Sequence, residues 1–198
     1  MSTSESLRLG WIGLGSMGLA MATNMQKHMQ QQQNAFPPLK YWNRTLARGK
    51  PLDDLGAIAC PTIAELAQTS DVIFISVSDD AALQTIISHI QESGNISGKT
   101  ILDTTTIHPC TSTTLSRILS RSNATYLTGP VFGATPVART GTLLMALAGP
   151  APAISRVTPF LTGVIARHVV PAGATPSHAV LLKTHKQLYH SGTHDAAI

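Results

Sequence analysis

The sequence has few cysteines, few acidic residues and no long apolar run, and each shortage excludes a class of protein. Cys60 and Cys110 are the only two cysteines, too few and too far apart for a disulfide scaffold or a zinc site, and they are expected to behave as small buried hydrophobes. No apolar stretch approaches the length of about 18 residues that a membrane span needs. No basic segment followed by an apolar one stands near the start. We therefore expect neither secretion nor membrane insertion, and a cytoplasmic location by default.

The charge balance and the size of the chain further limit which class of protein this is and which partners it can have. The 198 residues carry 14 Lys and Arg against 10 Asp and Glu, a formal net charge of +4 that comes mostly from the shortage of acids. Because the basic residues are scattered, we expect no nucleic-acid partner; attraction for a polyanionic cofactor explains the charge. Hydrophobic residues make up 43% of the chain, enough for the buried core of one full domain plus a fragment.

The most informative motif lies close to the N-terminus. Residues 9–18 read LGWIGLGSMG, an apolar run that breaks into three spaced glycines, and helix-forming residues follow. A strand, a tight turn and a helix start in this order predict a dinucleotide-binding turn, whose glycines make the turn, admit a pyrophosphate and let the helix pack on the strand. The helix N-terminus offers N–H groups and a positive dipole end to phosphates. We predict that this turn binds the cofactor through Gly13, Leu14, Gly15, Ser16, Met17 and Gly18.

The second predicted strand indicates which nucleotide is bound. Residues 39–43 are expected to form this strand, and Asn43, Arg44 and Thr45 lie at its carboxyl end, where the adenine ribose of a dinucleotide should lie. An NAD site usually has an Asp or Glu there, whereas a guanidinium and a hydroxyl suit a 2′-phosphate. The prediction is NADP rather than NAD. The alternative is that Arg44 only caps or solvates a loop.

Short β-rich runs and helical stretches alternate along the rest of the chain. We predict further strands over 56–60, 72–77, 100–103, 124–127, 143–148 and 167–170, and helices after Thr62 and over 80–92, 113–120 and 150–161. The run at 72–77 is apolar apart from one serine, as expected of a strand buried on both faces of a parallel sheet. This alternation predicts an α/β fold with a doubly wound parallel sheet, a Rossmann domain, and ligands at the carboxyl ends of the strands.

Polar residues gather where two of these strands end. Val77 and Ser78 end the fourth strand, and Thr104, Thr105 and Thr106 follow the fifth. Consecutive hydroxyls after a buried strand can bond a nicotinamide ribose, a carboxamide or a substrate carboxylate. An ordinary turn that caps the next helix is equally consistent with the spacing.

Four segments in order resemble the β-hydroxyacid dehydrogenase family, the group of 3-hydroxyisobutyrate dehydrogenase, 6-phosphogluconate dehydrogenase and imine reductases, and they look most like fungal members. The segments are the opening glycine turn, the turn at 103–109, the loop at 129–134 with its sequel at 141–143, and Lys183. The resemblance implies reversible hydride transfer between NADP(H) and a hydroxyl-bearing, carbonyl or imine carbon. It further implies a cofactor contact on the nicotinamide side by Thr106 and a small-molecule substrate lined by Thr105, Gly133 and Ala134. Lys183 matches the family's catalytic lysine, which donates and accepts the proton.

The loop at 129–134 departs from the family's usual Pro-Val-Ser-Gly-Gly core. Phe132 replaces the serine and Ala134 replaces the second glycine. A substrate carboxylate loses a hydroxyl donor and meets an aromatic face instead. We therefore expect a substrate that is less acidic or bulkier than a small hydroxy acid.

The resemblance also implies a shortened chain. Relatives continue after the catalytic lysine with an all-helical domain of roughly a hundred residues, the size of a typical second domain, whereas 15 residues follow Lys183 here. We expect an NADP-binding Rossmann domain over 7–175, and over 176–198 the start of an interdomain helix and a disordered tail. A homo-oligomer or a partner that supplies a helical domain could complete the substrate pocket, and no metal site is expected. Two alternatives to an enzyme of the family's ordinary kind stay open: a non-catalytic NADP-binding module, and an accessory reductase of a fungal biosynthetic pathway.

Overall fold

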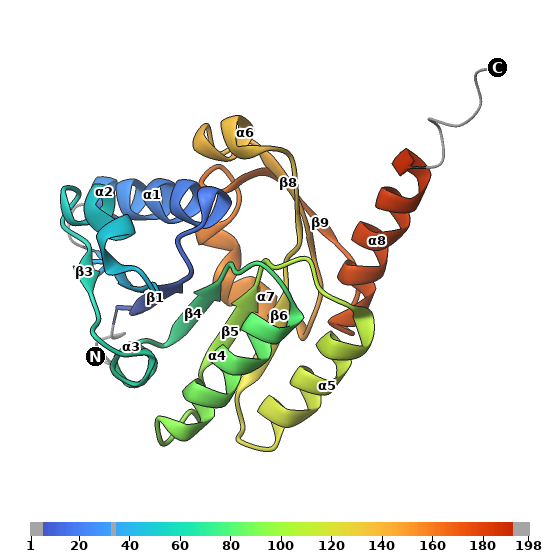
Figure 1. Cartoon of the computed structure of the whole chain (residues 1–198), viewed down its shortest axis with the longest axis horizontal. Helices are drawn as coiled ribbons and strands as arrows, with labels where there is room; N and C mark the ends of the chain where they lie inside the picture. The colour runs from blue at the N-terminus through green and yellow to red at the C-terminus, as the bar shows by residue number, and fades with distance from the viewer. Residues whose placement is uncertain (1–5, 33–34, 192–198) are drawn as a thin grey trace.

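The computed structural model describes residues 6–32 and 35–191, and within them six parallel strands form the main sheet (Figure 1). Their order across the sheet is β3-β2-β1-β4-β5-β6. The strands are β1 (Leu9–Ile12), β2 (Lys40–Trp42), β3 (Ile58–Ala59), β4 (Val72–Ile75), β5 (Thr100–Asp103) and β6 (Thr125–Thr128). The order reverses beside β1, because β2 and β4 flank it on opposite sides. The predicted doubly wound parallel sheet is confirmed, and its switch point lies at the carboxyl end of β1.

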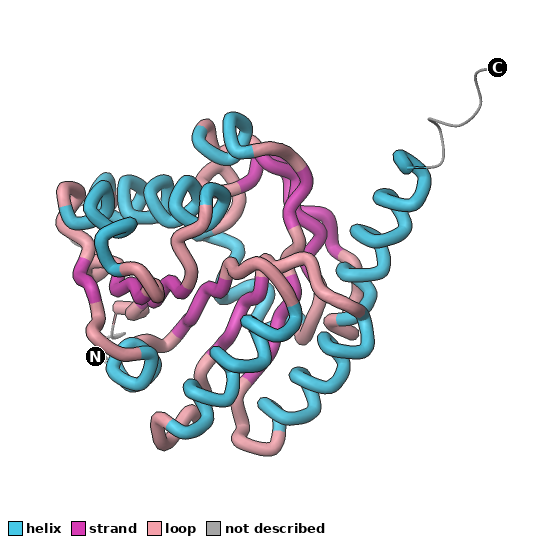
Figure 2. The backbone as a smooth tube through the Cα atoms, in the orientation of Figure 1, coloured by secondary structure: helices cyan, strands magenta, loops and turns pink. Residues whose placement is uncertain are grey.

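Helices cover both faces of this sheet (Figure 2). The alternation of side chains along β4 shows this, because Val72 and Phe74 belong to one hydrophobic cluster and Ile73 and Ile75 to the other. The first cluster includes residues of α1 (Ser16–Gln31), α2 (Lys50–Asp53) and α7 (Ala151–Val157). The second includes residues of α3 (Ile63–Thr69), α4 (Asp80–Glu92) and α5 (Pro109–Ser120).

A second, smaller sheet follows the first, with the strand order β7-β8-β9. It comprises β7 (Val131–Phe132), β8 (Leu143–Leu147) and β9 (Ala166–Pro171), with β8 antiparallel to β7 and parallel to β9. The remaining elements are η1 (Leu46–Gly49), α6 (Thr135–Arg139), η2 (Thr158–Phe160) and α8 (Ser177–Ser191). In Figure 1, α8 leads away from the rest of the fold. Residues 192–198 of the predicted tail lie outside the described residues, and the domain boundary at 175 stays a prediction.

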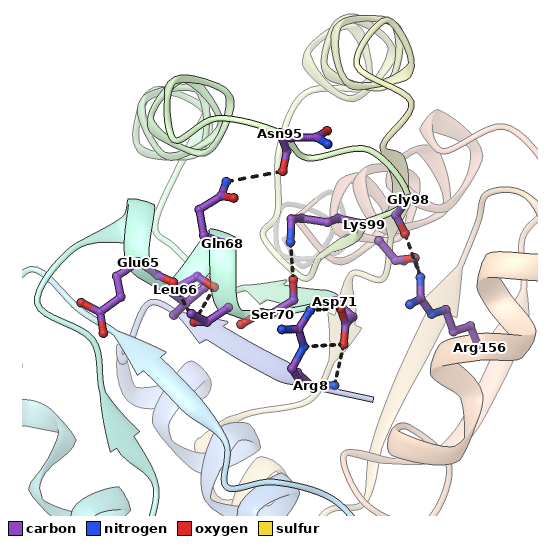
Figure 3. A network of polar contacts seen from close by, with 12 residues as sticks. Arg8, Glu65, Leu66, Gln68, Ser70, Asp71, Asn95, Gly98, Lys99 and Arg156 are labelled. Carbon is purple, nitrogen blue, oxygen red and sulfur yellow. Dashed lines mark hydrogen bonds and ion pairs between the residues drawn. The ribbon is translucent and has the colours of Figure 1, made fainter. Parts of the chain in front are cut away.

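A polar network holds the amino ends of the strands together (Figure 3). Arg8, just before β1, pairs with Asp71, just before β4, at 2.6 Å between Nη2 and Oδ1. Lys99, just before β5, donates from Nζ to the carbonyl oxygen of Ser70 at 2.8 Å, and burial lowers its pKa. Arg156 of α7 donates to the backbone carbonyl two residues before β5 at 3.0 Å. These side chains serve the fold, because the ligand-binding edge of a parallel sheet is the opposite one.

Candidate cofactor site

The turn between β1 and α1 needs its three glycines for different reasons. Gly13 has a φ of +95°, and a Cβ atom there would lie 2.2 Å from the carbonyl oxygen of Ser76. A Cβ atom on Gly18 would lie 2.2 Å from the carbonyl oxygen of Gly13. A Cβ atom on Gly15 would meet no atom within 4 Å. Gly13 and Gly18 are therefore required to build the turn, whereas Gly15 leaves open space beside it.

The N-terminus of α1 differs from those of the helices on the other face of the sheet. Gly15 is its N-cap, and no side chain caps it. In contrast, Thr62 caps α3, Asp79 caps α4 and His108 caps α5. The backbone N–H groups of the first turn and the positive end of the helix dipole therefore suit an external anion such as a pyrophosphate.

A groove of about 970 Å³ opens beside this turn. It is bounded by α1, by η1 and α2, and by α6, and Gly15 and Ser16 lie at one end of it. Its charged lining consists of Lys27, Arg48 and Arg139, with no acidic residue among the described residues that line it. A cationic groove next to an uncapped helix N-terminus fits a ligand with several phosphates. Arg48 was missed by sequence reasoning; a second arginine four residues after Arg44 was the available signal.

Asn43 joins the glycine turn to the end of β2. Its side-chain oxygen accepts a hydrogen bond from the backbone N–H of Leu14 at 2.9 Å, and its Nδ2 donates to the carbonyl oxygen of Thr45 at 2.8 Å. Arg44 and Thr45 are exposed at this end of the strand. The structure thus brings the two predicted phosphate-binding segments together, with the Asn43 side chain holding one against the other. The individual contacts of these residues with a cofactor stay predictions.

The ends of β4 and β5 are also bonded to each other. The backbone N–H of Val77 donates to Oγ1 of Thr105 at 3.2 Å. Thr105 is buried, whereas the neighbouring Thr106 is exposed. Ser78 donates from Oγ to Asp79 at 2.6 Å. Thr106 therefore remains accessible for the predicted nicotinamide contact, and the predicted substrate contact of Thr105 stays a prediction for a side chain already bonded inside the fold.

Asp103 is a fully buried carboxyl at the end of β5. Its Oδ1 accepts from the backbone N–H of Thr105 at 2.8 Å, and its Oδ2 accepts from the Tyr126 hydroxyl at 3.0 Å. Burial raises the pKa of Asp103 to about 6, although hydrogen bonds from Thr105 and Tyr126 oppose the shift. Sequence reasoning left Asp103 without a role; an acid directly after an apolar strand and before three threonines was the signal that could have found it.

Lys183 lies beside the loop at 129–134, as the resemblance implied. Its Nζ donates to the carbonyl oxygen of Val131 at 2.6 Å and lies 4.5 Å from the centroid of the Phe132 ring. Gly133 and Ala134 follow on the exposed part of this loop. The structure therefore brings the predicted catalytic and substrate-binding residues together across α8 and β7, while their roles stay predictions.

The described part of the chain offers neither a metal site nor a membrane-spanning helix. There, no three His, Cys, Asp or Glu side chains gather closely enough to hold a metal ion. None of the helices described there combines the length and the apolar character needed to cross a bilayer.

The strand order, the glycine turn at the switch point and the uncapped helix beside a basic groove define a pyridine-nucleotide-binding Rossmann domain. Residues 8–173 match the family model described as the NAD binding domain of 6-phosphogluconate dehydrogenase, and the chain belongs to this family.

Most of its similar curated proteins are named as reductases, dehydrogenases or oxidoreductases, and others are named as the cytokine-like nuclear factor N-PAC of Danio rerio and Anopheles gambiae. The chain is 31% identical over 158 residues to 2-hydroxy-3-oxopropionate reductase of Escherichia coli, and this match covers 77% of this chain and 50% of that protein. It is 27% identical over 169 residues to the NADH-dependent oxidoreductase ucdB of Aspergillus ustus, and this match covers 84% of this chain and 55% of that protein. A solved reductive aminase from Aspergillus terreus, in complex with NADPH and ethyl-5-oxohexanoate, matches 94% of this chain and 63% of its own at a TM-score of 0.79 and 26% identity. The chain spans about half the length of these curated relatives.

The open space at Gly15 predicts that a methyl group there affects binding and not folding. Gly15→Ala should change the free energy of unfolding by less than about 1 kcal/mol, because alanine is only a poorer N-cap. It should weaken nucleotide binding at least about tenfold, because the methyl group occupies the space next to the phosphates. Calorimetric titration and urea denaturation measure the two effects. In the control Gly18→Ala, the added Cβ atom meets a carbonyl oxygen and the fold itself should be destabilised; unchanged nucleotide affinity of Gly15→Ala would contradict the site.

Proposed function

We propose that the protein is an NADP-dependent oxidoreductase of the 3-hydroxyisobutyrate dehydrogenase-related type, which transfers hydride between NADP(H) and a hydroxyl-bearing, carbonyl or imine carbon. The observation that carries this proposal is the basic groove beside the glycine turn, with Arg48 in its lining. The homologues differ in their named nucleotide, since one solved structure contains NADPH and one curated relative is NADH-dependent. The preference therefore has to be argued from the residues of this chain.

The end of β2 supports a 2′-phosphate. No Asp or Glu stands at Asn43, Arg44 or Thr45 to accept hydrogen bonds from ribose hydroxyls. The side chain of Asn43 is occupied by the glycine turn. Arg44 and Arg48 are both exposed, Arg44 shortly after β2 and Arg48 in η1. Their guanidinium groups can form charge-assisted hydrogen bonds with a phosphate.

Replacing either arginine should weaken the binding of NADPH and leave the binding of NADH nearly unchanged. Arg44→Ala and Arg48→Ala should each weaken NADPH binding about tenfold, because a charge-assisted hydrogen bond to the 2′-phosphate is lost. NADH binding should stay within about twofold, since NADH lacks that phosphate. Parallel calorimetric titrations measure both, with Arg121→Ala as a matched exposed control at the end of α5. Equal weakening of NADPH and NADH binding would show that neither arginine binds the 2′-phosphate.

The reaction itself is assigned to the edge where α8 meets the loop after β6. A bound nicotinamide supplies or accepts the hydride. Thr106 lies exposed at the carboxyl end of β5 to contact the nicotinamide side, and Gly133 and Ala134 line the substrate. Lys183, held near this loop by Val131 and Phe132, donates a proton to the reacting oxygen or nitrogen, or withdraws it in the reverse direction.

The Phe132 ring supports a substrate that is less acidic or bulkier than a small hydroxy acid. It packs against three buried alanines, Ala146, Ala148 and Ala179, and presents no donor to a carboxylate. The chain spans about half the length of its curated relatives. We include in the proposal a homo-oligomer or a partner that contributes to the substrate pocket.

A second candidate function is a non-catalytic NADP-binding module. It is favoured by the position of the Lys183 ammonium, which is bonded to a backbone carbonyl and lies against an aromatic ring. NADPH consumption with a panel of ketones, aldehydes and imines favours the enzyme. NADPH binding without any turnover favours the module, and it would count against the accessory reductase of a biosynthetic pathway, which requires a reductase step.

The lysine can be tested apart from the cofactor site. Lys183→Ala should lower NADPH-dependent turnover of the panel at least about a hundredfold, because the proton donor is lost. NADPH affinity should change by less than about twofold, since the nucleotide contacts lie elsewhere. Leu182→Ala, at a half-exposed neighbour on the same helix, serves as the control for helix packing. Turnover that survives in Lys183→Ala removes the lysine from the mechanism.

A further inference from the structure

We propose that Asp103 is a positioning residue for the cofactor: its ionised carboxyl holds the turn at 104–106, and through it the end of β4, in the arrangement that receives the nicotinamide end of the nucleotide. This inference rests on the proposed function, because it specifies how that same site is kept in shape. Its basis is a fully buried carboxyl whose bonds lead to the turn after β5 and, through Thr105, to the end of β4.

The bonds of Asp103 form a connected path. Its Oδ1 accepts from the backbone N–H of Thr105, and the hydroxyl of Thr105 also donates to the carboxyl. The same hydroxyl oxygen accepts the backbone N–H of Val77, which follows β4. The carbonyl oxygen of Asp103 accepts from the backbone N–H of Gly129 at 2.7 Å. One residue therefore fixes the turn after β5, the end of β4 and the start of the loop at 129–134.

This arrangement decides which threonine faces outward. Because the Thr105 side chain is turned inward to Asp103, it is buried, and the next residue, Thr106, is exposed at the carboxyl edge of the sheet. If the carboxyl no longer held the Thr105 amide, the backbone of the turn could rotate and Thr106 would lose its fixed direction. Nucleotide binding would then have to order the turn, and the affinity for the nucleotide would be lower.

Stability alone does not account for a carboxylate at this position. Burial raises the pKa of Asp103 from 3.8 to about 6. The folded protein therefore holds this proton more tightly than the unfolded chain does, so between these pKa values stability falls as the pH rises. The ionised form is present at neutral pH in spite of that cost, and Ile101 and Leu102 of the same strand show that apolar residues fill the neighbouring positions.

Protonation should loosen the turn. An ionised carboxyl is an acceptor only, and it receives two donors from Thr105 and one from Tyr126. The protonated carboxyl carries a donor of its own, which has to displace one of these bonds. The ionisable groups that face it are Tyr126 on β6 and Asp80 on α4, whose charge also raises the pKa of Asp103. Asp80 in turn accepts from the backbone N–H of His108, the N-cap of α5.

The test compares the dissociation constants of NADPH for the wild-type chain and Asp103→Asn by calorimetry from pH 5 to pH 8. The ratio of the two constants cancels the titration of the nucleotide's own phosphates. We expect Asp103→Asn to bind about tenfold more weakly at pH 8 and within about threefold of wild type at pH 5, because one acceptor for the turn is lost only where Asp103 is ionised. Tyr126→Phe keeps the aromatic ring and removes one hydrogen-bond donor to the carboxyl. It should weaken NADPH binding less than Asp103→Asn does, with the same dependence on pH. Ser112→Ala removes a buried hydroxyl without a described hydrogen-bond partner and should give a ratio near one throughout.

Amide hydrogen exchange of the nucleotide-free chain separates this inference from the proposed function. Asp103→Asn, or Tyr126→Phe if the first variant does not fold, should speed exchange at the amides of Thr105 and Val77 and leave the amides inside β5 unchanged. Unchanged exchange at these two amides overturns the positioning role, as does a ratio of dissociation constants that is near one or independent of pH. Failure of the wild-type chain to bind NADPH would refute the proposed function, and the exchange measurement would still decide the role of Asp103.

Discussion

The close approach of the glycine turn to the end of β4 is the constraint on which the candidate site depends. At Gly13 the backbone passes so near the carbonyl oxygen of Ser76 that a Cβ atom would lie 2.2 Å from it. The same turn then receives the first turn of α1, because Gly18 lies equally close to the carbonyl oxygen of Gly13. Backbone packed on backbone leaves no side chain over the N-terminus of α1. The uncapped amides and the open space at Gly15 follow from this packing, and they are what a pyrophosphate requires.

The two edges of the main sheet use polar groups in opposite ways. At the amino edge, Arg8 and Lys99 are bonded to Asp71 and to the backbone at Ser70, so their donors are satisfied within the fold (Figure 3). At the carboxyl edge, the amides of α1 and the cations of the groove have no acidic residue beside them among the described lining residues. This difference favours the carboxyl edge for the ligand without reference to any relative, because a bound anion there would complete the hydrogen bonding of the uncapped amides of α1.

The sequence predicted features whose causes are local. The glycine spacing, the helix start after Thr62 and the apolar strand after residue 71 each depend on a few neighbouring residues, and the turn, the cap of α3 and β4 agree with them. The short elements β7 and α6 were not predicted, because two or five residues carry no usable periodicity and these elements form only by packing on β8 and α1. The roles of Arg48 and Asp103 depend on neighbours brought together by the sheet, which no spacing along the chain reveals.

The loop at 129–134 and α8 are linked through the volume of the side chains between them. The Phe132 ring fits because β8 and α8 present Ala146, Ala148 and Ala179 where larger side chains would fill the space. Once seated there, the ring lies 4.5 Å from the Lys183 ammonium, so the alanines that seat the ring also influence the position of the lysine. A smaller residue at 132 would leave a void beside the alanines, and a larger residue at any of the three would displace the ring. The position of the lysine and the shape of the loop at 129–134 therefore depend on the same side-chain packing, and a change of volume at residue 132 would require compensating changes at these alanines.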